Sequence, residues 1–73
     1  MKLSEVKLNV NVKVIDCFND KNQKKRLLDM GITKGAIIKV IRKGILCPVE
    51  IFVKGTRIAI RKKEIEKIIV EEV

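Results

Sequence analysis

The chain has 73 residues, the size of a single domain, so residues 1–73 are predicted to form one folding unit. Its net charge is +8, and 12 isoleucines and 9 valines outnumber 5 leucines, a composition that favours short β-strands beneath a basic surface. No apolar run approaches the roughly 20 residues needed to span a bilayer, and the first residues lack the apolar core of a signal peptide, so we expect a cytoplasmic protein.

The first expected elements are a short turn and a strand with one buried face. Residues 3–6 are predicted to form a turn whose apolar residues contact the core. Val10, Val12 and Val14 then alternate with polar residues, and this period of two is typical of a half-buried strand. Asn9 precedes the strand and tolerates the left-handed backbone of a tight turn.

A single α-helix is predicted to follow, with a signal at each end. Asp20 suits the N-cap, because its carboxylate can accept a hydrogen bond from a backbone N–H of the first turn. Good helix formers predominate in residues 24–30. Gly31 suits the left-handed position directly after a helix, and Ile32 would then pack against Leu27 as in a Schellman ending.

A tight turn that needs a second glycine is predicted to lead into the next strand. Residues 33–36 fit a type II turn, in which Gly35 takes the positive φ of the third position. A strand at residues 36–41 follows directly. Replacing Gly31 or Gly35 by a β-branched residue is expected to cost about 1–3 kcal/mol through backbone strain.

The remaining chain is predicted to contain three more strands, which cover residues 49–54, 57–61 and 68–71. Gly55 and Thr56 are predicted to form a two-residue hairpin turn with glycine first, and residues 62–66 a single helical turn. The result is a mainly β fold: a small β-barrel of about five strands, with one short α-helix between the first and second strands. We expect closure into a barrel because it removes exposed strand edges.

The two cysteines, Cys17 and Cys47, lie far apart in the sequence and belong to no CxxC pair, and there is no histidine. We expect two small, half-buried thiols in a reducing compartment. A disulfide between them stays open, as does a weak transition-metal site completed by Asp16 and Glu50. Because soft-metal sites usually draw on several Cys or His ligands, we assign no metal-binding residue and expect no tightly bound cofactor.

No group of residues predicts catalysis. The sequence has no histidine, no glycine-rich phosphate loop and no paired nucleophile and base. General acid–base catalysis needs a group of tuned pKa in a pocket, and Asp29 at the expected helix end reads more simply as a solvated residue. We therefore expect a protein that binds a partner and is not an enzyme.

The candidate partner-binding surface lies on the expected helix and comprises Lys24, Lys25, Arg26 and Leu28. Leu28 points away from the buried side of the helix, so it would form an apolar anchor within a basic cluster and suit an acidic partner. Charge reversal at Lys25 and Arg26 is then expected to weaken capture of the partner and leave the fold intact. The alternative is that Leu28 packs under the loop at residues 44–47 and the basic residues are merely solvated.

A second functional class is a small basic β-barrel that binds nucleic acid or regulates transcription. Proteins that bind single-stranded nucleic acids generally pair basic grooves with stacking aromatic rings. The chain has no Tyr or Trp, and its only aromatic residues are Phe18 and Phe52. Nucleic acid is therefore the less favoured partner, and the same composition argues against conventional SH3 recognition of proline-rich peptides.

Four stretches carry motifs that point to a known family, and they are residues 3–6, 26–35, 54–61 and 68–70. They include a helix that stops at Met-Gly, a turn that ends in glycine and a Gly-Thr hairpin. In this order and at this length they resemble the FeoA family of small cytoplasmic proteins that accompany the bacterial ferrous iron transporter FeoB. Two positions depart from the family pattern, because Asn9 stands where many members have Gly and Lys34 where many have Pro.

The resemblance implies an SH3-like β-barrel that acts by binding. The implied partner is the cytoplasmic part of the FeoB-type membrane GTPase, whose ferrous iron uptake the protein would regulate without turnover of its own. Self-association and weak binding of a transition metal are compatible with the resemblance and stay open.

Overall fold

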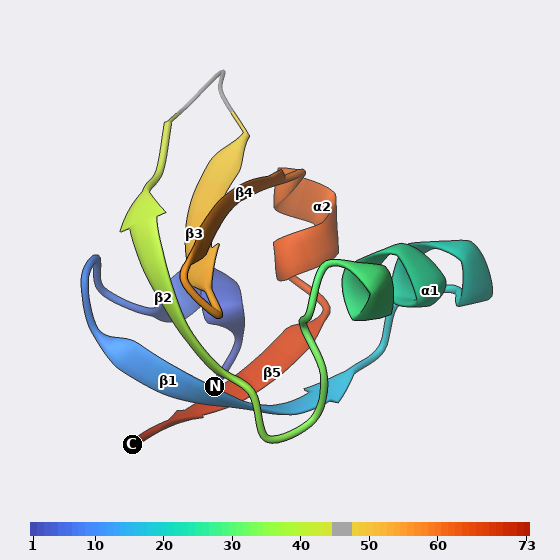
Figure 1. Cartoon of the computed structure of the whole chain (residues 1–73), viewed down its shortest axis with the longest axis horizontal. Coiled ribbons are helices and arrows are strands. Elements are labelled where there is room, and N and C mark those ends of the chain that lie inside the picture. Colours follow the sequence, from blue (N-terminus) through green and yellow to red (C-terminus); the bar gives the residue numbers. More distant parts are fainter. Residues whose placement is uncertain (45–47) are drawn as a thin grey trace.

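The computed structural model of the chain describes residues 1–44 and 48–73. Within them, five antiparallel strands form one sheet in the order β4-β3-β2-β1-β5 (Figure 1). The strands are β1 (Asn11–Cys17), β2 (Ile37–Arg42), β3 (Val49–Val53), β4 (Thr56–Ile60) and β5 (Ile68–Glu72). The helical segments are the 3₁₀ turn η1 (Leu3–Glu5), α1 (Lys21–Asp29) and α2 (Lys62–Ile65). The predicted mainly β fold, with its longer helix between the first two strands, is confirmed.

The sheet curls round a common interior without closing into a complete barrel. Strands β4 and β5 end the strand order and do not pair with each other. The N-terminus takes the outer edge of β5 instead, since the N–H of Val70 donates to the Met1 carbonyl at 2.8 Å and the Met1 amino group donates to the Val70 carbonyl at 2.9 Å. The expected closure is therefore incomplete, because Met1 occupies the edge at which β5 would have to meet β4.

Branched aliphatic side chains from all five strands fill the interior. The buried aliphatic strand residues are Val12, Val14, Ile38, Val40, Val49, Ile51, Val53, Ile60, Ile68 and Val70, and Cys17 at the end of β1 is buried with them. Leu3 and Val6, at the N-terminal turn, join them as predicted. Leu27 is the only fully buried residue of α1. The helix is consequently attached to the core mainly through Leu27.

Both predicted ends of α1 are confirmed by their hydrogen bonds. The Asp20 carboxylate accepts the backbone N–H of Gln23 at 2.9 Å, which satisfies one donor of the first turn. At the other end, the N–H of Ile32 donates to the Leu27 carbonyl at 2.9 Å. Gly31 adopts φ +93°, and its own N–H donates to the carbonyl of Leu28, which completes a Schellman ending. Helix α1 therefore has defined ends, which fix the positions of the side chains along it.

The turn between α1 and β2 is also the predicted one. The N–H of Ala36 donates to the Thr33 carbonyl at 3.0 Å, and Gly35 adopts φ +85°, as a type II turn requires. The N–H of Gly35 donates to the Val14 carbonyl at 2.7 Å, so the turn is fastened to β1. This contact sets the position of the residues that precede the turn.

The hairpin between β3 and β4 differs from the prediction by one residue. Its two turn residues are Lys54 and Gly55, with φ +50° and +78°, and Val53 pairs with Thr56. Positive φ at both positions is the pattern of a type I′ turn. The predicted turn at Gly55 and Thr56 is wrong, because its register would set Val49 opposite Lys62, where the chain has already entered α2. The observed register pairs all five residues of β3 with β4.

Replacing Gly35 by valine is expected to lower the free energy of unfolding by about 1–3 kcal/mol. A Cβ atom at this position meets no other atom within 4 Å, so the cost arises from the positive φ alone. Asparagine tolerates this backbone region, and Gly35→Asn should therefore cost clearly less than Gly35→Val. Urea unfolding of both variants measures the difference in the free energy of unfolding. Equal stability of Gly35→Val and Gly35→Asn would contradict a positive φ at this position.

Among residues 1–44 and 48–73, no helix is long and apolar enough to cross a membrane. The longest, α1, has nine residues.

Candidate docking surface on helix α1

The four residues predicted to bind a partner lie on different sides of α1. Lys24 and Leu28 are one turn apart, so their side chains share one side of the helix. Lys25 is exposed on the side away from the buried Leu27. Arg26 lies two positions from Lys24, and about 100° per residue carries it to the opposite flank. The structure therefore brings Lys24 and Leu28 together and separates them from Arg26.

Lys24 and Leu28 line a hollow of about 360 Å³ between α1, the end of β1 and the segment before β2. The lining residues are Asp16, Cys17, Lys24, Leu28, Ile32, Thr33 and Lys34. Its apolar part comes from the buried Cys17 and Ile32 and from Leu28, which is 52% exposed. Lys24 and Lys34 are exposed and carry the positive charge, and the Lys34 ammonium lies 4.0 Å from the Asp16 carboxylate. We call this feature the α1 hollow.

Leu28 is thus an exposed apolar residue beside basic side chains, as predicted. The alternative placed it under the loop at residues 44–47. Residues 45–47 of that loop lie outside the described part of the chain, whereas the hollow that Leu28 lines is formed with Cys17 and Ile32. The apolar residues that line this hollow with Leu28 accordingly belong to β1 and to the segment that follows α1.

The Cys17 thiol is a buried part of the α1 hollow. Burial raises its pKa above the ordinary value for a thiol, and the adjacent Asp16 carboxylate raises it further, while the Lys24 and Lys34 ammonium groups act in the opposite sense. The Asp16 carboxylate also accepts the backbone N–H of Cys17 at 2.8 Å. A raised pKa keeps the thiol protonated at neutral pH, so Cys17 acts here as a small apolar group.

The sequence left two alternatives open for the cysteines, a disulfide and a weak metal site. Cys47 lies outside the described residues, so its pairing and surroundings are not placed, whereas Cys17 is a free thiol. Where side chains are described, no three His, Cys, Asp or Glu residues come close enough together to hold a metal ion. Binding of a transition metal remains a prediction.

Arg26 has a structural role that the sequence analysis missed. Its guanidinium forms an ion pair and a hydrogen bond with the carboxylate of Glu64 in α2. Glu64 is only 1% exposed, and its carboxylate also accepts the backbone N–H of Arg61 at 3.3 Å, as the third residue of a helix often does. Arg26 therefore fastens α1 to α2, and reversing its charge would place two carboxylates side by side at the core.

Asn19 strengthens the same junction. It is buried, and its amide group donates to the Glu64 carbonyl at 3.1 Å and to the Gln23 side-chain oxygen at 3.4 Å. The signal for this cluster was Glu64 at the third position of the short helical turn. Its partners lie far away along the chain, and local patterns do not reveal such pairs.

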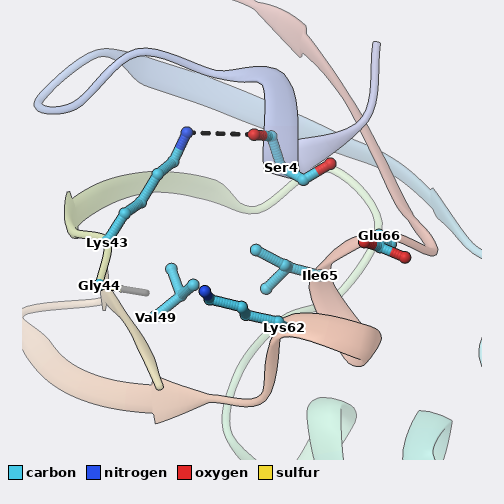
Figure 2. Close-up of a pocket in the computed structure, with 7 residues that line it drawn as sticks. All are labelled: Ser4, Lys43, Gly44, Val49, Lys62, Ile65 and Glu66. Carbon is cyan, nitrogen blue, oxygen red and sulfur yellow. Dashed lines mark hydrogen bonds between the residues drawn. The ribbon is translucent and has the colours of Figure 1, made fainter. Parts of the chain in front are cut away.

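A second hollow, of about 310 Å³, lies between η1, α2 and the segment after β2 (Figure 2). Val49 and Ile65 form its apolar wall, and the side chain of Lys62 extends across it. The Lys43 ammonium donates to the backbone carbonyls of Ser4 at 3.1 Å and Val6 at 2.6 Å. These bonds hold η1 against β2, so Lys43 serves the fold at this hollow.

The strand order, the short 3₁₀ turn and the small helix between β4 and β5 define the class of the protein, which is a small SH3-like β fold. Residues 1–72 match the family model of the FeoA domain, and the chain therefore belongs to the FeoA family. Among curated proteins, none matches the chain.

Several solved structures of FeoA proteins are similar over the whole chain. The FeoA protein from Chlorobium tepidum is 34% identical with a TM-score of 0.92, covering 100% of this chain and 70% of that one. An iron uptake regulatory protein, also FeoA, is 30% identical with a TM-score of 0.86, covering 99% of this chain and 94% of that one. The zinc complex of FeoA from Stenotrophomonas maltophilia is 28% identical with a TM-score of 0.81, covering 97% and 89%. That protein is described as a prokaryotic SH3 domain protein and a proposed activating factor of ferrous iron transport.

Proposed function

We propose that this chain is a small cytoplasmic accessory protein of bacterial ferrous iron uptake. It binds the cytoplasmic part of a FeoB-type membrane GTPase and regulates transport, and it performs no turnover of its own. Membership of the FeoA family over residues 1–72 is the observation that carries this proposal, because the family is associated with ferrous iron transport. The exposed apolar and basic side chains on α1 support a binding role.

The α1 hollow is the surface we assign to this contact. An apolar side chain of the partner enters the hollow against Leu28 and Ile32, and the neutral Cys17 thiol adds to the apolar contact. Burying the exposed half of a leucine contributes on the order of 1 kcal/mol. Carboxylates on the partner lie near Lys24 and Lys34, which orients the complex and speeds association. Lys25 adds to the positive field from the neighbouring side of α1.

The alternative function, nucleic-acid binding, has less support in the arrangement of aromatic rings. Phe52 is exposed on the outer face of β3, and the Lys39 ammonium lies 6.0 Å from the centre of its ring. Phe18 lies in the segment between β1 and α1. One ring beside one lysine is a poor stacking surface. Salt-dependent retention on DNA or RNA would identify this alternative.

Affinity capture tests the proposed function. The chain, carrying a purification tag, is immobilised and mixed with detergent-solubilised membranes from bacteria that produce a FeoB-type transporter. We expect the transporter to be retained at physiological salt. An unrelated protein of similar size and positive charge is the control, because a net charge of +8 attracts acidic proteins non-specifically. Equal retention on both resins, or retention on neither, would contradict the proposal.

A further inference from the structure

Strand β4 is an end strand of the sheet, and β3 is its only strand neighbour among the residues that the structure describes (Figure 1). The two-residue turn makes Val53 and Thr56 a pair that exchanges both backbone hydrogen bonds. Because such pairs alternate with non-bonded pairs along an antiparallel ladder, the N–H and C=O groups of Arg57 and Ala59 point away from β3.

These outward groups have no partner within residues 1–44 and 48–73. No described hydrogen bond uses the backbone of Arg57 or Ala59, and both residues are exposed. The other end of the sheet is different, since Met1 bonds to Val70 on the outer edge of β5. An unpaired strand edge is a ready template for an additional strand, and proteins that do not use such an edge usually cover or interrupt it.

The charge along this edge defines what it can accept. Residues 54–63 contain five cations and no carboxylate: Arg57 lies on β4, and Lys54, Arg61, Lys62 and Lys63 lie before or after the strand. The Arg57 guanidinium lies 3.7 Å from the Glu50 carboxylate of β3, and both side chains are on the outer face. A second copy of the chain, paired edge to edge, would bring Arg57 and the cations at both ends of β4 close to an identical set, and like charges held close together are destabilising. The edge therefore suits a segment that carries carboxylates.

We propose that the free edge of β4 binds an extended acidic segment of a partner protein as an added strand. The N–H and C=O groups of Arg57 and Ala59 form the backbone hydrogen bonds. Carboxylates of the segment lie on the outer face beside Arg57, and its alternate residues are apolar because they lie beside the half-buried Ile58. The proposal rests on the proposed function only in taking the partner to be a protein, and it does not require the α1 hollow.

A peptide titration followed by NMR tests this proposal. The probe is a short synthetic peptide in which Glu alternates with Val, added to the isotope-labelled chain. We expect the amide signals of Arg57 and Ala59 to shift in a saturable way and their hydrogen exchange to slow. A peptide in which Lys alternates with Val is the matched probe and should leave both signals in place. Shifts confined to α1, or equal binding of both peptides, would overturn the proposal.

Two variants separate backbone pairing from charge. Ala59→Pro removes an outward N–H without removing a ladder bond, and proline is tolerated at such edge positions. Arg57→Glu reverses the charge beside the added strand and also removes the exposed ion pair with Glu50. Lys7→Glu makes the same change in net charge elsewhere. We expect each edge variant to weaken peptide binding by about tenfold or more, with Lys7→Glu near the unmodified chain. Unchanged binding by Arg57→Glu would overturn the proposal.

Two further results complete the test. If Ala59→Pro does not fold, the backbone hydrogen bonds can be removed from the peptide instead. A Glu-Val peptide in which the N–H groups that face β4 are methylated cannot donate to the β4 carbonyls, and we expect it not to bind. Retention of RNA by the Arg57 and Ala59 edge, with no response to the peptide, would overturn the proposal. If the unmodified chain binds the peptide but does not capture the FeoB-type transporter, that result contradicts the proposed function and not the proposal for β4.

Discussion

Replacing Arg26 by alanine is expected to lower the free energy of unfolding by about 2 kcal/mol. The Glu64 side chain is 2% exposed, and without the guanidinium its carboxylate would be a buried charge lacking its partner. Fully buried pairs cost about 3–5 kcal/mol when one partner is removed. The Arg26 side chain is 45% exposed, so water can replace part of the lost interaction and the expected cost is smaller.

Urea unfolding of a small set of variants measures this effect. Lys25→Ala is the matched control, because it removes a neighbouring exposed cation and should change the stability by less than about 0.5 kcal/mol. Glu64→Gln removes the charge and keeps the shape, so adding Arg26→Ala to Glu64→Gln should cost less than Arg26→Ala alone. Such non-additivity is the signature of a direct interaction. If Arg26→Ala and Lys25→Ala were equally stable, the ion pair between α1 and α2 would be unimportant to the fold.

The second large effect concerns partner binding. The double variant Lys24→Glu with Leu28→Asp is expected to weaken capture of the FeoB-type transporter by at least about tenfold. It places two carboxylates at the α1 hollow, where the proposal has the partner contribute an apolar side chain and negative charge. Both residues are exposed, so we expect the stability of the fold to change little.

Two other variants make this experiment specific. Lys7→Glu with Lys67→Glu makes a comparable change in net charge at exposed positions outside α1, and it should retain capture. Lys25→Glu should weaken capture by less than the double variant, because Lys25 lies beside the hollow and does not line it. Capture that survives Lys24→Glu with Leu28→Asp would show that the partner uses another surface.

The features that the sequence predicts correctly are those that depend on residues close together along the chain. The cap at Asp20, the ending at Gly31 and the turn at Gly35 were all predictable, because each depends on one backbone conformation and a hydrogen bond within a few residues. The buried faces of the strands followed from alternation in the same way. Exposure of Leu28 was predictable because helical geometry separates it from the buried Leu27.

The features that the sequence did not reveal depend on residues that are distant along the chain. Arg26 and Glu64 are 38 positions apart, so Arg26 looked like another surface cation beside Lys24 and Lys25. The hairpin turn was predicted one residue too late in the sequence. The chain already enters α2 at Lys62, and only the complete strand register shows this. Closure of the barrel was over-predicted for a similar reason, since Met1 takes the edge of β5.

A calorimetric titration of the purified chain with the purified cytoplasmic domain of a FeoB-type transporter tests the central claim most directly. We predict saturable binding that weakens as salt is raised and is lost in the variant Lys24→Glu with Leu28→Asp. The same titration with Lys7→Glu and Lys67→Glu should match the unmodified chain. No saturable binding to the domain, in a sample whose fold is intact by NMR, would contradict the account.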